Sequence, residues 1–241
     1  MSVDHDAFFD DLYVRTTEPF LTEAMTVAEV KAFLSLSSVS AGQRVLDLGC
    51  GWGRHGPALT AQGLDVFGLE RASGPASRAR GNGLTVVRGD VRALPWAAGT
   101  FDAVACFYSS IFFFDEAQNL ECLREVKRVL APGGVFVLQA ANPLHLARLG
   151  EEERSWPLPD GSRIRERTRF ELSTGTEVGQ RRLTLPTGEV TEGGYRIRHY
   201  APGELEVMGF RAGLKLVEVK GSLSLAPWTR QSREVVAVFR A

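Results

Sequence analysis

The sequence predicts a three-layer α/β fold: a seven-stranded, mostly parallel sheet whose last strand is antiparallel, together with an antiparallel β insert. Two observations support this fold class. Short apolar segments alternate with helical patterns from residue 44 to residue 138, which is typical of a parallel sheet covered by helices on both faces. From about residue 151 the chain becomes polar and rich in turns, which indicates inserted antiparallel strands.

The first half of the chain carries the alternating pattern. Apolar residues recur at helical spacing near the start, and the segment at 101–107 is nearly all apolar, as expected for a strand buried on both faces. Pro57 suits the first turn of a helix, where its missing N–H costs little. The expected elements are a helical region at 5–38, strands at 44–48, 64–69, 84–87, 101–107 and 135–138, and helices at 57–62, 72–80 and 115–130.

The second half departs from this pattern and then returns to it. Turn sequences divide residues 151 to about 200 into three or four antiparallel strands. A helix at 202–211 and an antiparallel pair of strands at 214–220 and 234–240 complete the sheet. We therefore divide the chain into an N-terminal helical lid at 1–40, a core at 41–145 and 201–241, and a β insert at 146–200 that serves as a substrate lid or an oligomer surface.

Composition narrows the function classes. The net charge of −1 provides no basic surface for nucleic acid, and no apolar segment approaches membrane-spanning length. The three cysteines are scattered, which argues against a disulfide framework and a structural zinc site, so no metal is expected. Residues 1–6 are acidic and lack the apolar segment of a signal peptide. We expect a cytoplasmic protein that acts on a small molecule.

A glycine-rich loop follows the first predicted strand and points to a ligand. Gly49, Gly51 and Gly53 come at alternating positions, where a backbone without Cβ atoms can approach a bound molecule closely. Asp47 lies inside the end of that strand, and burying its carboxylate is costly unless it is paired or hydrogen-bonded. The loop therefore favours a cofactor with nucleoside character.

Two further acids support this interpretation. Glu70 and Asp90 follow the next two predicted strands, and ligands of open α/β sheets bind at the carboxyl ends of the strands. Glu70 lies about twenty residues past the loop, the distance at which an acid reaches ribose hydroxyls. Asp90 is placed to accept from an adenine amine, Val91 to donate its N–H to a ring nitrogen, and Gly49 to offer its carbonyl to an ammonium group.

A literal dinucleotide fingerprint is also present at residues 51–56, as Gly-x-Gly-x-x-Gly. Its register does not fit, because that fingerprint begins directly after the strand, where Gly49 stands here. The fingerprint also leaves Asp47 unexplained. An NAD-dependent oxidoreductase nevertheless remains an alternative, since Glu70 would serve that cofactor equally well.

Five segments resemble, in order, the motifs of the class I S-adenosylmethionine-dependent methyltransferases. They lie at 45–55, 68–70, 88–95, 101–104 and 123–134. The resemblance covers roughly residues 44–140 and 203–240 and implies a Rossmann-like fold. It implies that Asp47 and the loop 49–53, with Cys50, hold the methionine part of S-adenosylmethionine, and that Glu70 holds the ribose. It further implies adenine contacts for Arg71, Asp90 and Val91, and places Phe107 below the methionine chain. Trp52 departs from the family pattern, in which a small residue is usual.

A narrower resemblance rests on three parts of the chain: Phe8, Phe9, Leu12 and Tyr13 near the start, residues 174–175, and the segment 198–205. It is to small-molecule methyltransferases that carry an antiparallel β insert, sugar N-methyltransferases among them. This resemblance does not fix the substrate. A regulatory protein that binds S-adenosylmethionine without catalysis also remains open.

Methyl transfer is an in-line displacement in which alignment supplies much of the catalysis, and a base is needed only for a protonated nucleophile. The candidate bases are Tyr13, His55, Tyr108 and His199, although packing roles are common for such residues. The resemblance favours Tyr13, because an N-terminal helix commonly covers the site in these enzymes. The segment 106–109 lacks the Asn/Asp-Pro-Pro-aromatic motif of nucleic-acid amino-methylating enzymes, which argues against DNA.

The insert adds two sets of candidates. Arginines alternate at 163, 165, 167 and 169 and share one strand face, which favours a solvated, ion-paired surface over a clamp for an acidic substrate. Arg198 and Tyr200 share a face near the returning helix and are the candidates for substrate contact. A homodimer through the insert is a further expectation.

Overall fold

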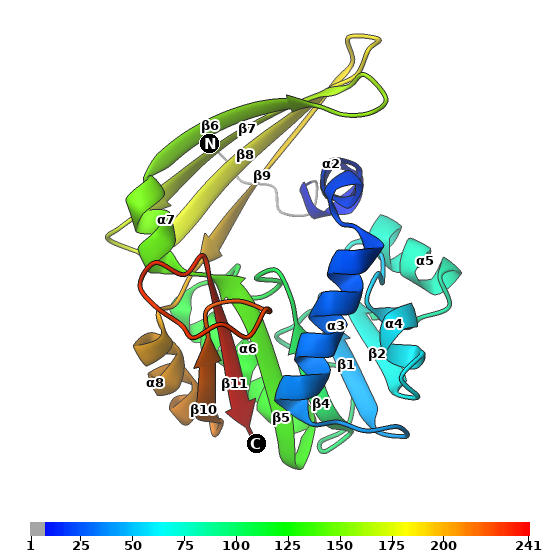
Figure 1. The fold of residues 1–241 in the computed structure, drawn as a ribbon, viewed down its shortest axis with the longest axis vertical. Helices are drawn as coiled ribbons and strands as arrows, with labels where there is room; N and C mark the ends of the chain where they lie inside the picture. The colour runs from blue at the N-terminus through cyan, green and yellow to red at the C-terminus, as the bar shows by residue number, and fades with distance from the viewer. Residues whose placement is uncertain (1–7) are drawn as a thin grey trace.

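The computed structural model describes residues 8–241 (Figure 1). The expected start of the helical region at 5–7 and the acidic N-terminal residues lie outside the described part. The main sheet has the order β10-β11-β5-β4-β1-β2-β3, with β1 at Arg44–Leu48, β2 at Asp65–Glu70, β3 at Thr85–Arg88, β4 at Phe101–Cys106, β5 at Leu130–Ala141, β10 at Lys215–Lys220 and β11 at Glu234–Arg240.

Strand directions confirm the predicted fold class. β1 lies inside the sheet and pairs in parallel with β2 and β4, while β11 is antiparallel to both β5 and β10. The apolar segments therefore form a seven-stranded sheet that is parallel except around its last strand. β5 begins earlier than expected, because Leu130 already pairs with Phe101 before the Pro-Gly-Gly turn that we expected to precede the strand.

Alternation along the strands divides the core into two layers. Val45 packs on one face of the sheet beneath α3 (Glu23–Ser37), α4 (Gly56–Thr60) and α5 (Ser73–Gly81). Leu46 packs on the other face with α6 (Glu116–Val129) and α8 (Pro202–Ala212). Burial of both faces explains why the central strands are apolar along their whole length. No helix within residues 8–241 is long and apolar enough to span a membrane.

The insert forms a separate antiparallel sheet of four strands that arches above the end of the main sheet (Figure 1). Its strands follow one another as hairpins, in the order β6 (Glu151–Pro157), β7 (Arg163–Glu171), β8 (Thr176–Thr184) and β9 (Val190–Arg198). This confirms the expected antiparallel insert. A short helix, α7 (Pro143–Leu149), precedes it and was not expected from the sequence; Asn142 caps it by accepting from the N–H of Leu144.

The N-terminal region bridges the insert and the core. The prediction of one helical region was wrong in its continuity, because the chain forms four pieces: η1 (Phe8–Leu12), α2 (Tyr13–Thr17), η2 (Glu18–Phe20) and α3. Asp10 has a non-helical backbone and Pro19 lies in the 3₁₀ turn, so the helix cannot run straight through. Phe8 and Leu12 pack against insert residues such as Ile164 and Leu183. The first pieces thus lie under the insert, while α3 covers the sheet.

Candidate active site

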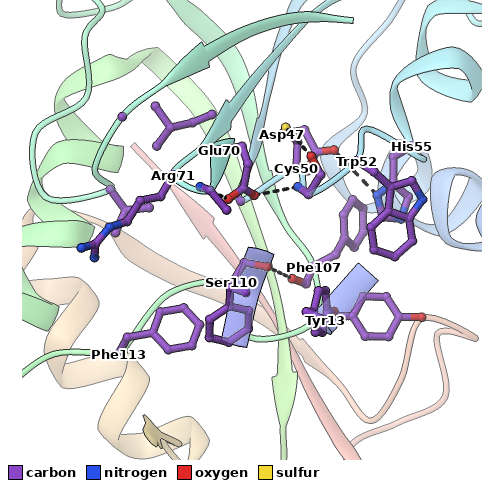
Figure 2. Close-up of a pocket in the computed structure, with 18 of the residues that line it drawn as sticks. Tyr13, Asp47, Cys50, Trp52, His55, Glu70, Arg71, Phe107, Ser110 and Phe113 are labelled. Carbon is purple, nitrogen blue, oxygen red and sulfur yellow. Dashed lines mark hydrogen bonds and ion pairs between the residues drawn. The ribbon is translucent and has the colours of Figure 1, made fainter. Parts of the chain in front are cut away.

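A cavity of about 210 Å³ lies at the carboxyl ends of β1, β2 and β4 (Figure 2). The residues that the sequence placed there come from separate segments of the chain. Those that line the cavity are Tyr13, Asp47, Gly49, Cys50, Gly51, His55, Glu70, Arg71, Asp90, Val91, Phe107 and Tyr108. In Figure 2, Asp47 and Glu70 lie across the cavity from Ser110 and Phe113. The fold therefore gathers nearly all of the predicted cofactor residues in one place.

The loop after β1 is shaped by its glycines. Gly49 has a φ of +76°, and a Cβ there would stand 2.4 Å from the Cβ of Ser110. Gly53 also has a positive φ, yet it does not line the cavity, and a Cβ on it would meet the Cβ of Ala79 at 2.9 Å. Gly53 therefore allows the loop to pack closely on α5, whereas Gly49 opens the cavity itself.

Glu70 holds two neighbouring loops through backbone N–H groups. Its Oε2 accepts from Gly51 at 2.9 Å and its Oε1 accepts from Ala72 at 2.8 Å. Burial raises the pKa of the Glu70 carboxyl above its usual value, even though the N–H bonds from Ala72 and Gly51 act to lower it. The carboxylate thus faces the cavity in an already organised position.

Asp90 is engaged by its own loop. The Arg92 guanidinium donates to Oδ1 at 2.9 Å and to Oδ2 at 2.6 Å, and its hydrogen bonds lower the pKa of the Asp90 carboxyl. Arg92 also lies over the ring of Phe114, 4.1 Å from its centroid. Any ligand amine that approaches Asp90 must therefore share this carboxylate with Arg92.

Asp47 carries a buried oxygen without a hydrogen-bond partner. The residue is 1% exposed, and its Oδ2 makes no hydrogen bond within the described part of the chain. The nearest base is Nδ1 of His55 at 3.7 Å, which is too long for a hydrogen bond. A buried carboxylate in this state is costly unless a ligand supplies a donor.

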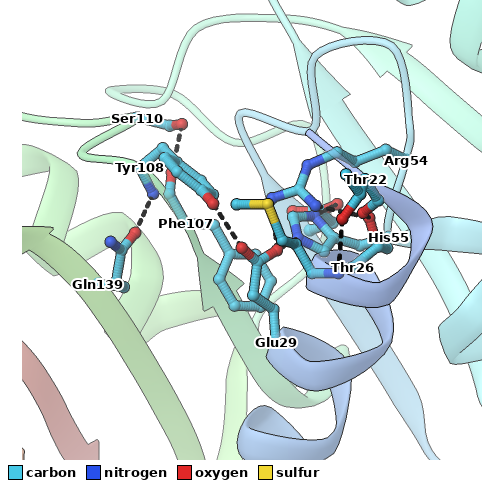
Figure 3. A network of polar contacts seen from close by, with 11 residues as sticks. Thr22, Thr26, Glu29, Arg54, His55, Phe107, Tyr108, Ser110 and Gln139 are labelled. Atoms are coloured by element: carbon cyan, nitrogen blue, oxygen red, sulfur yellow. Dashed lines mark hydrogen bonds and ion pairs between the residues drawn. The ribbon is translucent and has the colours of Figure 1, made fainter. Parts of the chain in front are cut away.

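Glu29, which the sequence analysis missed, is the centre of a polar network beside the cavity (Figure 3). It lies on α3 and is 7% exposed. Its carboxylate contacts Nε2 of His55 at 2.9 Å and accepts from the Arg54 guanidinium and the Tyr108 hydroxyl. The available signal was its position on the helix: Glu29 stands three residues after Thr26 and four before Phe33, on the buried face.

His55 is held between two acids. It stands at the N-cap position of α4, but its side chain makes no cap hydrogen bond and packs in the interior instead. Its ring is 4% exposed and stacks on Phe107 with a centroid separation of 4.1 Å. Burial acts to lower the pKa of His55, but contacts with Asp47 and Glu29 outweigh it and the pKa is raised. The imidazole is therefore stabilised as a cation.

A second, larger cavity of about 560 Å³ lies between the core and the insert. Its lining comes from β5 and α7 on one side and from β7, β8 and β9 on the other. Tyr108 is the only described residue that lines both cavities. Its backbone has a φ of +56°, a strained conformation for a tyrosine, and its amide donates to the side-chain oxygen of Gln139.

Three candidates lie outside both cavities. Arg198 pairs with Glu204 and lies over the ring of Tyr200. The Tyr200 hydroxyl donates to Glu116 at 3.0 Å and accepts from Asn119. These contacts tie the end of β9 to α6 and α8, and neither Arg198 nor Tyr200 lines either cavity. His199 is buried and contacts Glu177 at 3.0 Å, and only Glu177 reaches the second cavity.

The alternating arginines of β7 lie on an exposed face. Arg165 pairs with Glu153 and Arg167 with Glu151, both across the β6–β7 ladder, while Arg169 pairs with Glu171. This agrees with the solvated, ion-paired interpretation of the stripe. Within residues 8–241 no group of three or more histidine, cysteine, aspartate or glutamate side chains is arranged to hold a metal ion.

Comparison with known proteins identifies the family. A family model for a methyltransferase domain matches residues 45–134. The cypemycin N-terminal methyltransferase of a Streptomyces species is 31% identical over 208 residues, which cover 82% of this chain and 83% of that protein. The CcbJ methyltransferase of Streptomyces caelestis has a related structure, with a TM-score of 0.83, 24% identity and 98% coverage of both chains.

A further solved structure shares the fold. S-adenosylmethionine-bound CalS10, an amino pentose methyltransferase of Micromonospora echinaspora, has a TM-score of 0.69, with 19% identity over 96% of this chain and 97% of that one. The family match, the relative that spans most of the chain and the shared fold agree with the motifs at 45–55 and 123–134. The chain belongs to the class I S-adenosylmethionine-dependent methyltransferases.

Proposed function

We propose that this enzyme binds S-adenosylmethionine in the cavity at the ends of β1, β2 and β4 and methylates an amine of a small molecule held in the second cavity. The observation that carries the proposal is the position of Tyr108, which lines both cavities. Ligands in the two cavities would both border this residue, which is where they would meet. Direct displacement requires such a meeting, because the nucleophile must reach the methyl carbon in line with the breaking bond.

The residues of the first cavity fit the cofactor. The unpartnered Oδ2 of Asp47 suits the ammonium of the methionine part, which supplies the donor that this buried oxygen lacks. Glu70 would take the ribose hydroxyls, and Asp90, Val91 and Arg71 would surround the adenine. When bound, the cofactor supplies a methyl group whose S–C bond breaks as the amine nitrogen forms its N–C bond, giving S-adenosylhomocysteine and a methylammonium.

The second cavity supports an amine as the acceptor. Glu177 and Glu234 line it, and neither is paired with an arginine or lysine in the described part of the chain. Burial raises the pKa of Glu234, as expected for a carboxylate without a cationic partner. The lining also holds Arg154, Arg169 and Arg181, each paired with a glutamate, and Arg233, so the two acids favour a basic ligand only in their own part of the cavity. By its name, the cypemycin enzyme is an N-terminal methyltransferase, which supports an amine as the acceptor.

The candidate bases are poorly suited to remove a proton. Burial raises the pKa of Tyr13 and of Tyr108, so neither forms a phenolate readily, and the acids around His55 favour its protonated state. We infer that the amine attacks in its neutral form, having given up its proton to water or to a carboxylate of the second cavity such as Glu234, and that the enzyme acts by alignment, with Tyr13, Tyr108 and His55 as walls of the first cavity. The methylammonium product then loses its proton to water.

The N-terminal region fits the proposed lid. Phe9, Tyr13 and Leu21 line the first cavity, so a cofactor is covered from this side. The division into a lid at 1–40, a core and an insert at 146–200, and the homodimer through the insert, stay predictions. Family membership leaves an NAD-dependent activity without support.

The test combines binding and turnover. Calorimetry should show that the wild-type protein binds S-adenosylhomocysteine. In a separate turnover assay, the primary amines benzylamine, glucosamine and alanyl-alanine should be methylated, so that S-adenosylhomocysteine forms from S-adenosylmethionine. Benzyl alcohol and glucose are the matched acceptors without an amine and should release none. Absence of binding would contradict the cofactor assignment. Binding with turnover of the alcohols alone would contradict the amine assignment.

A further inference from the structure

Glu29 meets three partners that belong to different parts of the active site. His55 and Arg54 come from the loop after β1, and Tyr108 comes from the segment after β4. In Figure 3, the Glu29 carboxylate lies between Tyr108 on one side and His55 and Arg54 on the other. α3 thereby joins the cofactor loop to the residue that separates the two cavities.

The ionised form of Glu29 is stabilised by its neighbours although the side chain is buried. Burial acts to raise the pKa of this carboxyl, but hydrogen bonds from His55 and Tyr108, together with the positive charge of Arg54, outweigh it and the pKa is lowered. An ionised carboxylate has no proton to donate and only accepts hydrogen bonds. The direction of the bond between Glu29 and Tyr108 is therefore fixed: the phenol donates and the carboxylate accepts.

This direction determines what Tyr108 can offer a ligand. A phenol has a single hydroxyl proton, and that of Tyr108 is engaged in the hydrogen bond to Glu29. The Tyr108 oxygen can therefore only accept a further hydrogen bond. The side chain is also held in place, because its amide is bound by Gln139 and the Arg54 guanidinium lies 5.1 Å from its ring centroid. Tyr108 lines both cavities, and its hydroxyl, held by Glu29 on α3, can offer a ligand only an acceptor.

We propose that Glu29 is a positioning residue, which makes the Tyr108 oxygen an acceptor so that an N–H of the substrate amine binds there and the nitrogen lone pair faces the methyl group. This inference rests on the proposed function, because it requires an amine in the second cavity. It assigns Tyr108 the role of orienting the nucleophile. In orienting the amine Glu29 acts through Tyr108, while its contacts with His55 and Arg54 support the wall of the first cavity; it does not touch the substrate.

Three variants test the pair. Glu29→Gln keeps the shape of the side chain but removes the charge that fixes the bond, and Tyr108→Phe removes the hydroxyl without touching the Glu29 helix. We expect each to lower kcat for the best amine about 10-fold to 100-fold, since misplacement of a reacting group by about 1 Å costs about 100-fold. The double variant should lose no more than the worse single variant, because both changes break one interaction.

Controls separate this role from a structural one. Glu23→Gln makes the same change on an exposed position of α3 and should leave kcat unchanged. Calorimetry with S-adenosylhomocysteine should give a dissociation constant within about 2-fold of the wild type for Tyr108→Phe and Glu29→Gln, because a positioning role moves kcat rather than cofactor binding.

The outcomes are distinct. A wild-type kcat in Tyr108→Phe would overturn the inference while leaving the proposed function intact. So would a double variant whose loss of kcat equals the product of the two single losses. A Glu29→Gln protein that loses cofactor binding along with kcat would show a structural role and overturn it as well. If Glu29→Gln does not fold, Tyr108→Phe alone decides. A wild type that binds S-adenosylhomocysteine but methylates none of the amines would instead refute the proposed acceptor, and the inference with it.

Discussion

Glu70 accepts the backbone N–H of Gly51 at 2.9 Å, so a carboxylate at the end of β2 fixes the conformation of the loop after β1. The second carboxylate oxygen accepts the N–H of Ala72 and fixes the following turn in the same way. Because these donors come from two segments, Glu70 organises the cavity wall before any ligand enters. A ligand hydroxyl then meets a preformed acceptor, which lowers the cost of ordering on binding.

The first prediction concerns the affinity of this site. We expect Glu70→Gln to bind S-adenosylhomocysteine about 10-fold to 100-fold more weakly, since hydrogen bonds to a charged group contribute about 1.5–3 kcal/mol. Isothermal titration calorimetry at neutral pH measures the change. Asp65→Asn, at the exposed start of the same strand, is the matched control and should bind as the wild type does. Equal affinity in the two variants would refute the assignment of Glu70.

The raised pKa of Glu70 adds a pH dependence. Ribose hydroxyls donate to the ionised carboxylate, so affinity should fall as acidification protonates Glu70. Because burial raises this pKa, the loss should begin above the value of about 4.3 that is typical of glutamate. Calorimetry at several pH values between about 7.5 and 5 measures it. In Glu70→Gln the affinity should be nearly flat over the same range, and a parallel decline in both proteins would place the titrating group elsewhere.

The second prediction concerns the charge on His55. A histidine with a raised pKa in the folded state contributes stability that is complete below about pH 6.5 and is lost as the pH rises through the folded-state value. His55→Gln should therefore be less stable than the wild type by about 1–3 kcal/mol near pH 6, and the difference should shrink toward pH 9. Urea unfolding at the two pH values measures it.

His145 supplies a control with the opposite sign. Burial and the nearby Arg233 lower its pKa, so the folded state resists its protonation and the stability of the wild type falls on acidification. His145→Gln removes this penalty and should gain relative stability at low pH. If the stability difference from the wild type changed with pH in the same direction for both histidine variants, the raised pKa of His55 could not be attributed to Asp47 and Glu29.

The third prediction compares two glycines of the cofactor loop. Both Gly49 and Gly51 have positive φ, which costs an alanine about 1–2 kcal/mol. Only Gly49 also lacks room, since its Cβ would collide with Ser110, whereas a Cβ on Gly51 would meet nothing within 4 Å. Gly49→Ala should therefore be less stable than Gly51→Ala by a further amount of about 1–3 kcal/mol, typical of overpacking. Chemical unfolding measures the stability of both variants. Equal losses of stability would show that the positive φ, and not the contact with Ser110, accounts for the whole effect.

The sequence was sufficient for the sheet and for grouping the proposed cofactor residues around one cavity, because both depend on local patterns. Val45 and Leu46 belong to a strand that is apolar on both faces, and Glu70 and Asp90 follow from where neighbouring strands end. Gly53 shows the limit of such reasoning. It shares the motif with Gly49 and Gly51, but its neighbour is Ala79 on a helix twenty-six residues later, which no local pattern reveals.

The acceptor side was harder to predict because its contacts are long-range. Glu29 and Tyr108 are seventy-nine residues apart, and their pairing depends on α3 crossing the end of β4. Arg198 and Tyr200 were expected on one strand face, but β9 ends at Arg198, and Glu204 and Asn119 already engage the two side chains. Residue type and spacing identify polar groups near a site, whereas only the fold shows which of them are already satisfied.

The last prediction contrasts two arginines of the insert. Arg165 is an exposed ion-pair partner of Glu153, and such surface pairs contribute at most about 1 kcal/mol, so Arg165→Gln should leave stability and methyl transfer almost unchanged. Arg181 is largely buried; it donates to Glu166 at 2.9 Å and to Thr16 at 2.8 Å and lies over the ring of Phe8.

Arg181→Gln should therefore cost about 2–3 kcal/mol, because it leaves the Glu166 carboxylate without its cation and frees the N-terminal segment from the insert. Hydrogen exchange read by mass spectrometry locates the effect. Faster exchange is expected in residues 8–20 and in β7, while β1 and β2 keep the wild-type rate. Since Tyr13 of the same segment lines the cofactor cavity, S-adenosylhomocysteine should also dissociate faster from this variant. Unchanged exchange in residues 8–20 would mean that the apolar contacts of Phe8 and Leu12 hold the segment without Arg181.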